Sequence, residues 1–427
     1  MDMIATNSSK TEPIKYKKIL AGSVGNLIEW FDWTIYAAFA IFFSSQFFPP
    51  GNDTAALLAT FAVFAVGFFM RPVGGWLIGL FSDRFGRRNA LALTIIMMAV
   101  GSLLIGITPT YESIGLLAPL LLVLARLIQG LSLGGEYASA TTYLTEIAPD
   151  KQRGFYSSFL FMSAALGILM ASGLGWILTT TLSKTDMNAW GWRIPFIIGA
   201  IGGVVGIWIR QSIAKEDDTN VEKKEVVKQP LRSLIRDYPI ETLRIIGFST
   251  LSTYAFYVFM AYLPTYAIRH GGADPKIAFG ANTVAIIFYM FMQPLFGYLS
   301  DKIGRKPQLI TFALGNLLFF YFVMQFVNDS FVTLLLIEMF GLTLYAMYSS
   351  IAPAIMAEQF PSNIRAVGIG TPYNLMVAIL GGTTPYLLTW LQSIHMESIF
   401  YFIVLLAAFI SLITFVKMPE TAGSKLK

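Results

Sequence analysis

Acidic and basic side chains stand inside long apolar stretches of this sequence, where a charge is costly. Glu29 and Asp32 are three residues apart and share one helical face with Tyr36. In another stretch, Arg126 shares a helical face with Gln129. A carboxyl paired with a buried guanidinium stays ionised, and it takes up a proton when the guanidinium moves away, because burial disfavours the charged form. These residues predict either proton transfer or an internal ion pair.

Two interpretations therefore compete for each of these charges. We favour a proton-coupling role for Asp32 with Arg126 over a permanent ion pair between their two helices. For Glu29, and for Glu136 about a quarter-turn from the Arg126 face, both interpretations stay open. Glu338 is a further charge in an apolar stretch, 212 residues after Arg126, and the same offset separates two copies of a repeated loop pattern described below. Its carboxyl faces either a partner in the other half of the chain or a water-filled outer cavity.

Twelve apolar runs must position these charges. Of 427 residues, 55% are hydrophobic and only 13% are charged, which is about half the charged share of a soluble domain. Runs of roughly 20 residues or more can cross a hydrocarbon core of about 30 Å. Lipid accepts only helices or closed barrels, and these runs do not alternate polar with apolar residues, so we expect an all-α membrane protein. The runs cover residues 18–43, 55–81, 89–108, 114–146, 154–180, 191–213, 241–268, 277–300, 307–327, 331–357, 366–394 and 397–417.

The basic residues predict the orientation of the helices. Most of the 30 Lys and Arg precede the first run, follow even-numbered runs or surround the central loop. The loops on the other side hold Lys184, Arg193, Arg269 and Lys276. By the positive-inside rule, both termini and the central loop are cytoplasmic. The basic pI of about 9.1 is then a topology signal and not a sign of a nucleic-acid partner.

The sequence contains two related halves. The loop at residues 79–88 (GLFSDRFGRR) recurs at residues 297–306 (GYLSDKIGRK). The pattern Glu146-x-x-Pro-x-x-x-Arg153 recurs as Glu358-x-x-Pro-x-x-x-Arg365. Two parallel six-helix halves with a ligand site between them near the bilayer midplane are typical of alternating-access carriers.

These repeated loops predict a cytoplasmic gate. Glycine lets neighbouring helices approach closely, and Asp83 and Asp301 at helix ends can pair with an arginine of an adjacent loop. Such a cluster closes one side of the protein in one state and releases it in the other. Charges that only anchor the topology need no fixed spacing, so we favour the gate. The predicted gate residues are Gly79, Asp83, Arg84, Gly86, Arg87, Arg88, Glu146, Arg153, Gly297, Asp301, Gly304, Arg305, Glu358 and Arg365.

The same pattern divides the chain into five segments. We expect a cytoplasmic tail at 1–17, a six-helix half at 18–213, a cytoplasmic linker at 214–240, a second six-helix half at 241–418 and a cytoplasmic tail at 419–427. The linker is charged and solvated, and it ends in a short amphipathic piece at 231–238 that we expect at the membrane surface.

Several functional classes lack the residues that they need. The chain has no cysteine and two histidines, so we predict no disulfide and no metal site. No HExxH or GxxxxGK[ST] motif is present, which argues against a metalloprotease-type enzyme, a bound nucleotide cofactor and ATP as the energy source. Neither a channel nor a receptor accounts for the duplicated halves. We expect a monomeric carrier whose partners are a small-molecule substrate, protons and membrane lipid, with no nucleic acid.

The duplicated loop resembles the signature of the major facilitator superfamily. Three further stretches resemble its metabolite:proton symporter branch, at residues 25–32 (GNLIEWFD), 126–136 (RLIQGLSLGGE) and 190–196 (WGWRIPF). The resemblance implies a twelve-helix major facilitator fold and cotransport of protons with an organic acid or an osmolyte. In related proton-coupled sugar carriers, an acid in the first helix pairs with an arginine in the fourth, and Asp32 and Arg126 match these positions by motif.

Within that branch, the chain looks most like the 2-oxoglutarate permeases, on residues 65–75, 381–386 and 393–397. This resemblance implies proton symport of 2-oxoglutarate or a related dicarboxylate in a bacterial inner membrane, with proline, betaine, citrate and shikimate as alternatives. Arg71 and Arg126 supply the two cations that a dicarboxylate needs, unless Arg71 instead fixes its helix to backbone carbonyls. The candidate substrate-binding residues are Arg71, Arg126, Tyr36, Gln129, Tyr137, Tyr257, Gln293, Tyr348 and Asn374.

Overall fold

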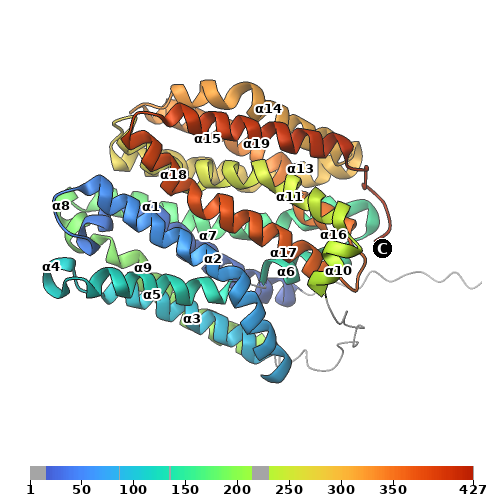
Figure 1. Cartoon of the computed structure of the whole chain (residues 1–427), viewed down its shortest axis with the longest axis horizontal. Coiled ribbons are helices and arrows are strands. Elements are labelled where there is room, and N and C mark those ends of the chain that lie inside the picture. Colours follow the sequence, from blue (N-terminus) through green and yellow to red (C-terminus); the bar gives the residue numbers. More distant parts are fainter. Residues whose placement is uncertain (1–15, 86, 134–135, 214–229, 427) are drawn as a thin grey trace, which may run out of the picture.

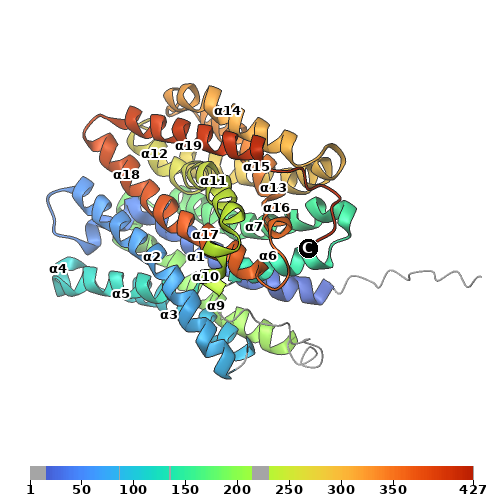
Figure 2. The same ribbon diagram turned by 45° about the vertical axis from the view of Figure 1, so that its right-hand side comes forward.

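The computed structural model describes residues 16–85, 87–133, 136–213 and 230–426, with the backbone alone at some positions inside these ranges. Every regular element within them is helical (Figure 1). The helices run side by side in one bundle, with the first half of the chain along one flank and the second half along the other (Figures 1 and 2).

The first half contains six long helical stretches. Its elements are α1 (Tyr16–Phe47), α2 (Asp53–Phe85), α3 (Arg87–Ile107), α4 (Tyr111–Ile114), α5 (Leu117–Ser132), α6 (Glu136–Ile147), α7 (Arg153–Thr181), α8 (Lys184–Asp186), a π-helical turn (Met187–Gly191) and α9 (Arg193–Ile213). A 3-10 turn at Asp150–Gln152 leads into α7.

A short helix, α10 (Pro230–Arg236), precedes the second half. Its elements are α11 (Pro239–Phe256), a π-helical turn (Tyr257–Tyr262), α12 (Leu263–Arg269), α13 (Pro275–Ile303), α14 (Lys306–Gln325), α15 (Phe331–Ser349), α16 (Ala352–Gln359), α17 (Arg365–Met376), a π-helical turn (Val377–Gly381), α18 (Gly382–Ser393) and α19 (Glu397–Lys417).

Each predicted apolar run coincides with one helix or with a series of consecutive helices. Within the described ranges, eight helical stretches are long and apolar enough to cross a membrane, or nine when the pair 184–191 and 193–206, bent by 42°, counts as one span. Large apolar side chains such as Trp76, Leu120 and Phe402 are exposed on the outside of the bundle, as expected for a surface that faces lipid. The all-helical membrane architecture is therefore confirmed.

Four runs that read as continuous are in fact divided. Helix α5 ends at Ser132, inside run 114–146, and run 331–357 breaks between α15 and α16. Runs 241–268 and 366–394 each contain a π-helical turn. Proline explains part of this, because it cannot donate the helical hydrogen bond: Pro353 opens α16, and Pro372 and Pro385 flank the turn at Val377–Gly381. Single π-helical turns are frequently found at functional sites.

The two halves meet along α7 and α13 for nearly the full length of these helices. A Cβ added at Gly297 of α13 would lie 2.6 Å from the carbonyl oxygen of Gly154 on α7. Near the other end of the same interface, a Cβ at Gly175 would lie 2.5 Å from the ring of Phe279. Glycine at these positions brings the two backbones together, so the interface is closed at both ends.

Candidate substrate site and ion-pair cluster

A fully buried arginine lies at the centre of the first half. Arg126 on α5 donates from Nη1 to Oε1 of Gln129 at 2.8 Å, and Gln129 donates from Nε2 to Oγ of Ser102 on α3 at 2.9 Å. The Nε and Nη2 groups of Arg126 have no hydrogen-bond partner among the described residues. Buried guanidinium donors without an acceptor are costly, so this arrangement is suited to receive an anion.

An indole ring joins this arginine to a second one. The Cζ atoms of Arg126 and Arg71 lie 3.8 Å and 4.8 Å from the ring centre of Trp33 on α1. Tyr36 and Phe68 supply further ring faces, at 4.3 Å from Arg126 and Arg71 respectively. Aromatic faces attract cations, so these rings hold two like charges in one buried region.

Glycines set the position of Arg126. A Cβ at Gly67 of α2 would lie 3.1 Å from the Trp33 ring and 3.2 Å from the carbonyl oxygen of Arg126. A Cβ at Gly130 would come within 2.1 Å of the Gly67 carbonyl oxygen, and one at Gly74 within 2.0 Å of the Leu131 carbonyl oxygen. Helices α2 and α5 therefore touch backbone to backbone, which presses the guanidinium against the rings.

Asp32 is buried beside this arginine but is not bonded to it. Both of its carboxylate oxygens lack a hydrogen-bond partner among the described residues, and no ion pair within 4.0 Å joins it to Arg126. Ser102 and Arg126 both interact with the carboxyl, so Ser102 and Gln129 link the two residues indirectly. A Cβ at Gly199 of α9 would lie 2.2 Å from Oδ1 of Asp32. The direct ion pair that the sequence offers as an alternative is not formed in this structure.

Of the other two predicted acids, only Glu29 has a described side chain. Glu29 is buried on α1 and interacts electrostatically with Tyr257 and Tyr373 of the second half. Glu136 begins α6, and its side chain lies outside the described part of the chain.

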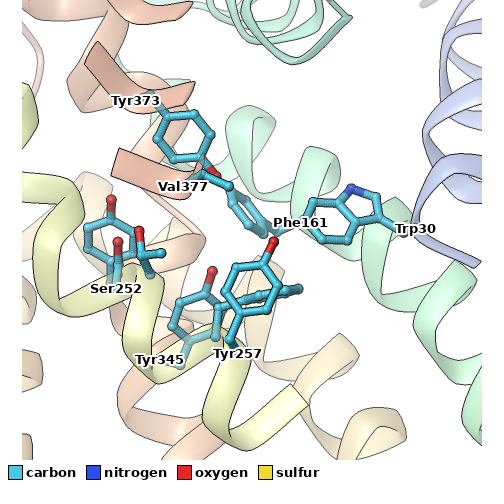
Figure 3. Close-up of a pocket in the computed structure, with 10 residues that line it drawn as sticks. Trp30, Phe161, Ser252, Tyr257, Tyr345, Tyr373 and Val377 are labelled. Carbon is cyan, nitrogen blue, oxygen red and sulfur yellow. The ribbon is translucent and has the colours of Figure 1, made fainter. Parts of the chain in front are cut away.

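An aromatic pocket lies between the halves (Figure 3). Trp30 of α1 and Phe161 of α7 face residues of α11, α15 and α17 and of the two π-helical turns in the second half. Arg71 interacts electrostatically with Tyr257 and Tyr373, which places the pocket next to the arginines. The lining residues are Trp30, Phe161, Ser252, Thr253, Phe256, Tyr257, Tyr345, Tyr348, Tyr373 and Val377.

Of the predicted binding residues, Tyr257 and Tyr348 line this pocket. Tyr137 stacks on Tyr373 with ring centres 4.3 Å apart, directly behind the pocket wall. Gln293 lies elsewhere, because its Nε2 donates to Ser349 at 2.9 Å inside the α13–α15 interface.

Two further predicted binding residues are also outside the lining. The hydroxyl of Tyr36 donates to the carbonyl oxygen of Thr60 at 3.0 Å, which fixes the ring beneath Arg126. Asn374 is buried on α17 and interacts with other residues there.

Two arginines and two acids of the repeated loops meet at one end of the bundle. Arg153 Nη1 lies 2.9 Å from Glu358 Oε1, and Arg305 Nη2 lies 3.5 Å from the same oxygen. Arg305 Nη1 also pairs with Asp301 Oδ1 at 2.8 Å. We call Arg153, Asp301, Arg305 and Glu358 the ion-pair cluster. It joins α7 of the first half to α13, α14 and α16 of the second.

Asp301 also caps a helix of the opposite half. Its carboxylate accepts from the backbone amides of Gly154 and Phe155, each at 2.8 Å, at the start of α7. A negative charge at a helix N-terminus is favourable, so the cap binds α13 to α7.

The duplicated Glu-x-x-Pro-x-x-x-Arg pattern forms reciprocal pairs between its copies. Glu358 pairs with Arg153, and Glu146 pairs with Arg365 at 2.7 Å. Each glutamate thus binds the arginine of the other half. In the first copy of the glycine loop, Arg84 lies 5.3 Å from the Phe85 ring centre. Gly86 lies outside the described residues, and only the backbone is described at Gly79, Asp83, Arg87 and Arg88.

The segment after α19 contacts the ion-pair cluster, although the sequence predicts only a cytoplasmic tail there. Thr421 Oγ1 donates to Glu358 Oε2 at 2.5 Å, and Arg153 Nη1 donates to the carbonyl oxygen of Ser424 at 3.0 Å. The C-terminal segment lies beside α16 in Figures 1 and 2. A short polar stretch after the last helix carries no periodic signal that would place it here.

Glu420 caps the start of α14. Its carboxylate accepts from the backbone amides of Arg305 and Lys306 at 2.9 Å and 3.0 Å, and from those of Thr421 and Ala422 at 3.0 Å and 2.9 Å. Partial burial of this carboxyl acts to raise its pKa, but the four amide donors together lower the pKa below its ordinary value.

Comparisons with known proteins agree with this architecture. Residues 18–213 match the family model for "Sugar (and other) transporter", and residues 276–427 match that for "Major Facilitator Superfamily". The alpha-ketoglutarate permease of Escherichia coli K12 is 39% identical over 92% of this chain and 91% of its own length. A putative proline/betaine transporter of Staphylococcus aureus is 34% identical over 100% of this chain and 93% of its own length.

Solved structures share the fold. The proton:xylose symporter XylE, bound to 6-bromo-6-deoxy-D-glucose, superimposes with a TM-score of 0.73 at 19% identity, over 96% of this chain and 97% of the other. The partially occluded inward-open conformation of the xylose transporter XylE from E. coli gives the same TM-score over 99% of its chain. This chain belongs to the major facilitator superfamily and is a multi-pass membrane transporter of small molecules, not an enzyme.

Proposed function

We propose that this transporter is a proton-coupled symporter of a small organic acid, with 2-oxoglutarate or a related dicarboxylate as its cargo, working by alternating access. The observation that carries the proposal is the pair of buried guanidinium groups at Trp33. Arg71 and Arg126 interact unfavourably with each other, and both have donors without an acceptor among the described residues. A dianion would satisfy these donors and relieve the repulsion.

Proton coupling would act through Asp32. Its carboxyl is buried and has no hydrogen-bond partner among the described residues, and Ser102, which interacts with it, is bonded through Gln129 to Arg126. An anion bound at Arg126 neutralises the nearest cation, and the carboxyl then takes up a proton more readily. Substrate and proton would therefore bind together. The sugar:proton relatives of the same fold are consistent with this assignment.

We further propose that both termini and the ion-pair cluster face the cytoplasm of a bacterial cell, in its inner membrane. The distribution of Lys and Arg supports this orientation. The cluster would then close the inner side of the substrate path and open when α7 and α13 part there. Both arginines and the pocket come from one chain, so a monomer suffices.

A zwitterionic osmolyte is the second candidate. Relatives named as proline/betaine transporters cover almost the whole chain, and the pocket walls are aromatic, as a quaternary ammonium group prefers. The pocket lies next to Arg71, however, which interacts electrostatically with Tyr257 and Tyr373 in its wall. This guanidinium group would repel a further cation, so we place the osmolyte after the dicarboxylate.

Counterflow tests the choice of cargo. Vesicles that contain the purified protein are loaded with unlabelled 2-oxoglutarate, citrate, shikimate, proline or betaine, and uptake of the same compound in labelled form is measured in each case. We expect exchange with 2-oxoglutarate. Arg71→Gln removes a charged hydrogen bond of about 1.5–3 kcal/mol, so its half-saturating concentration should rise roughly ten- to hundred-fold.

Arg236→Gln on the exposed surface of α10 is the matched control and should exchange like the wild type. Saturable exchange of betaine or proline without any exchange of 2-oxoglutarate would refute the dicarboxylate proposal. An unchanged half-saturating concentration in Arg71→Gln would remove Arg71 from the binding site.

A further inference from the structure

A second buried acid lies apart from Asp32 and Arg126. Glu338 on α15 is 1% exposed, and its Oε2 atom has no hydrogen-bond partner among the described residues. Its carboxyl is near Asn282 of α13, whose Nδ2 group also has no hydrogen-bond partner among the described residues. Helix α15 also packs against α11, α14, α16 and the turn at Tyr257–Tyr262, and within the described residues none of these brings a charged or titratable group to the carboxyl. Among the described residues, Glu338 is therefore an acid at membrane depth without a counter-ion.

The neighbour of this acid is bonded to the other half of the protein. Ser172 on α7 donates to Oδ1 of Asn282 at 2.7 Å, and its Oγ lies 3.0 Å from Oγ1 of Thr283. All these side chains are buried. We call Ser172, Asn282, Thr283 and Glu338 the polar cluster. It spans the α7–α13 interface, as the ion-pair cluster does elsewhere along the same two helices.

The two clusters lie toward opposite ends of that interface. Asn282 follows the start of α13 at Pro275 by two turns, whereas Asp301 lies in the last turn before Ile303. Ser172 and Gly154 are separated in the same way along α7. In alternating access the halves part at one end at a time. The polar cluster is therefore positioned where the end opposite the ion-pair cluster must open.

Protonation of Glu338 and closure of this end support each other. A carboxylate at membrane depth with no cation nearby is costly, so the closed interface favours the neutral acid. When α13 moves away from α7, Asn282 loses Ser172 and water reaches the cluster. Water then accepts the proton of Glu338 and solvates the carboxylate that remains. The two protonation states thus favour two positions of α13.

We infer that Glu338 is a second proton-binding site, occupied while α7 and α13 are closed at the end opposite the ion-pair cluster and vacated when that end opens. The inference rests on the proposed proton-coupled carrier but needs no particular cargo. It adds a proton site in the second half to the one proposed at Asp32 in the first.

Spin-label distances can test this directly, because the chain has no cysteine. Thr181→Cys and Lys276→Cys place labels at exposed positions near the ends of α7 and α13. The distance distribution is measured in lipid nanodiscs across a range of pH, without substrate. We expect the long-distance population of this labelled pair to grow as pH rises. With Glu338→Gln, which mimics the protonated acid, the low-pH distribution should persist at every pH.

Two control variants make the result specific. Glu338→Asp should keep the pH response, and so should Glu112→Gln on the exposed α4. An unchanged pH response in Glu338→Gln, a short distance at every pH in the labelled parent, or an opening governed by sodium instead of pH would each overturn the inference. A response lost in Asp32→Asn and kept in Glu338→Gln would do so as well.

Because no substrate is present, this experiment is separate from the cargo proposal. Absent 2-oxoglutarate transport with a Glu338-dependent opening leaves the inference standing. Normal transport with an opening that does not depend on Glu338 removes the inference alone.

Discussion

The side chains at the proposed substrate site are held by contacts of very small tolerance. Arg126 rests on Trp33 because glycines let α2 and α5 touch, and Asp32 has room for its carboxyl because Gly199 has no side chain. Asp32, Arg71 and Arg126 could be found from sequence, since charges inside apolar runs are rare. Trp33 and Ser102 could not, because one of 8 Trp, or a lone Ser in a membrane helix, has no distinguishing signal.

Gly199→Ala tests the space beside Asp32. Its methyl group would lie 2.2 Å from Oδ1 of Asp32, so the carboxyl or α9 must shift. Overpacking of this kind costs about 1–3 kcal/mol. We expect proton-driven uptake in vesicles to fall by roughly ten-fold or more.

The same helix supplies the control for this change. A Cβ at Gly202 meets nothing within 4 Å, so Gly202→Ala should transport like the wild type. Equal uptake by the two variants would show that the carboxyl position does not matter.

At the scale of elements, α7 and α13 act as the contact between the halves. Their approach depends on glycine at the end that holds the ion-pair cluster, and Asp301 of α13 caps α7 there. Pairing of these helices was not predicted, because the repeat shows which loops correspond and not which helices touch. The π-helical turns inside two apolar runs were also missed, since hydropathy does not register a π-helical turn.

Gly297→Ala should prevent this approach. The added methyl group would lie 2.6 Å from a backbone oxygen of α7, which cannot rotate away. We expect a lower melting temperature in detergent and slower counterflow. Gly173→Ala on α7, whose Cβ would meet Thr283 at an ordinary 3.8 Å, should change neither. Identical behaviour of the two variants would contradict a close-packed interface.

The cap on α14 predicts a pH effect. The pKa of Glu420 is lower in the folded protein than its ordinary value of about 4.3, so the ionised carboxylate stabilises the fold above that pH. This stabilisation is lost as pH falls through the lower folded pKa. Glu420→Gln should therefore melt at a lower temperature than the wild type near pH 7, with the difference shrinking below about pH 4.

The size of this effect is small, because the carboxyl is partly exposed and solvent screens it. Melting curves of the two proteins across the pH range provide the measurement. A constant difference between them at every pH would show that Glu420 acts through packing instead of charge.

At the scale of the whole molecule, the duplicated sequence becomes a reciprocal structure. Glu146 binds Arg365 while Glu358 binds Arg153, so each half holds the other with the same pattern. Repeat spacing and hydropathy predict the two-half architecture well, because both are periodic patterns that can be read from the sequence. They do not reveal that Thr421 closes onto Glu358, a contact that spans 63 residues and carries no periodic pattern. The residues that join the halves were predicted, but the segment that covers them was not.

Proton-driven uptake is the most direct test of the account. Vesicles that contain the wild type or Asp32→Asn receive an inward proton gradient, and accumulation of labelled 2-oxoglutarate is followed beside gradient-free counterflow. We predict that the wild type accumulates 2-oxoglutarate, and that Asp32→Asn loses accumulation while it retains counterflow. Accumulation in Asp32→Asn equal to that of the wild type, or no 2-oxoglutarate transport by the wild type under any gradient, would contradict the account.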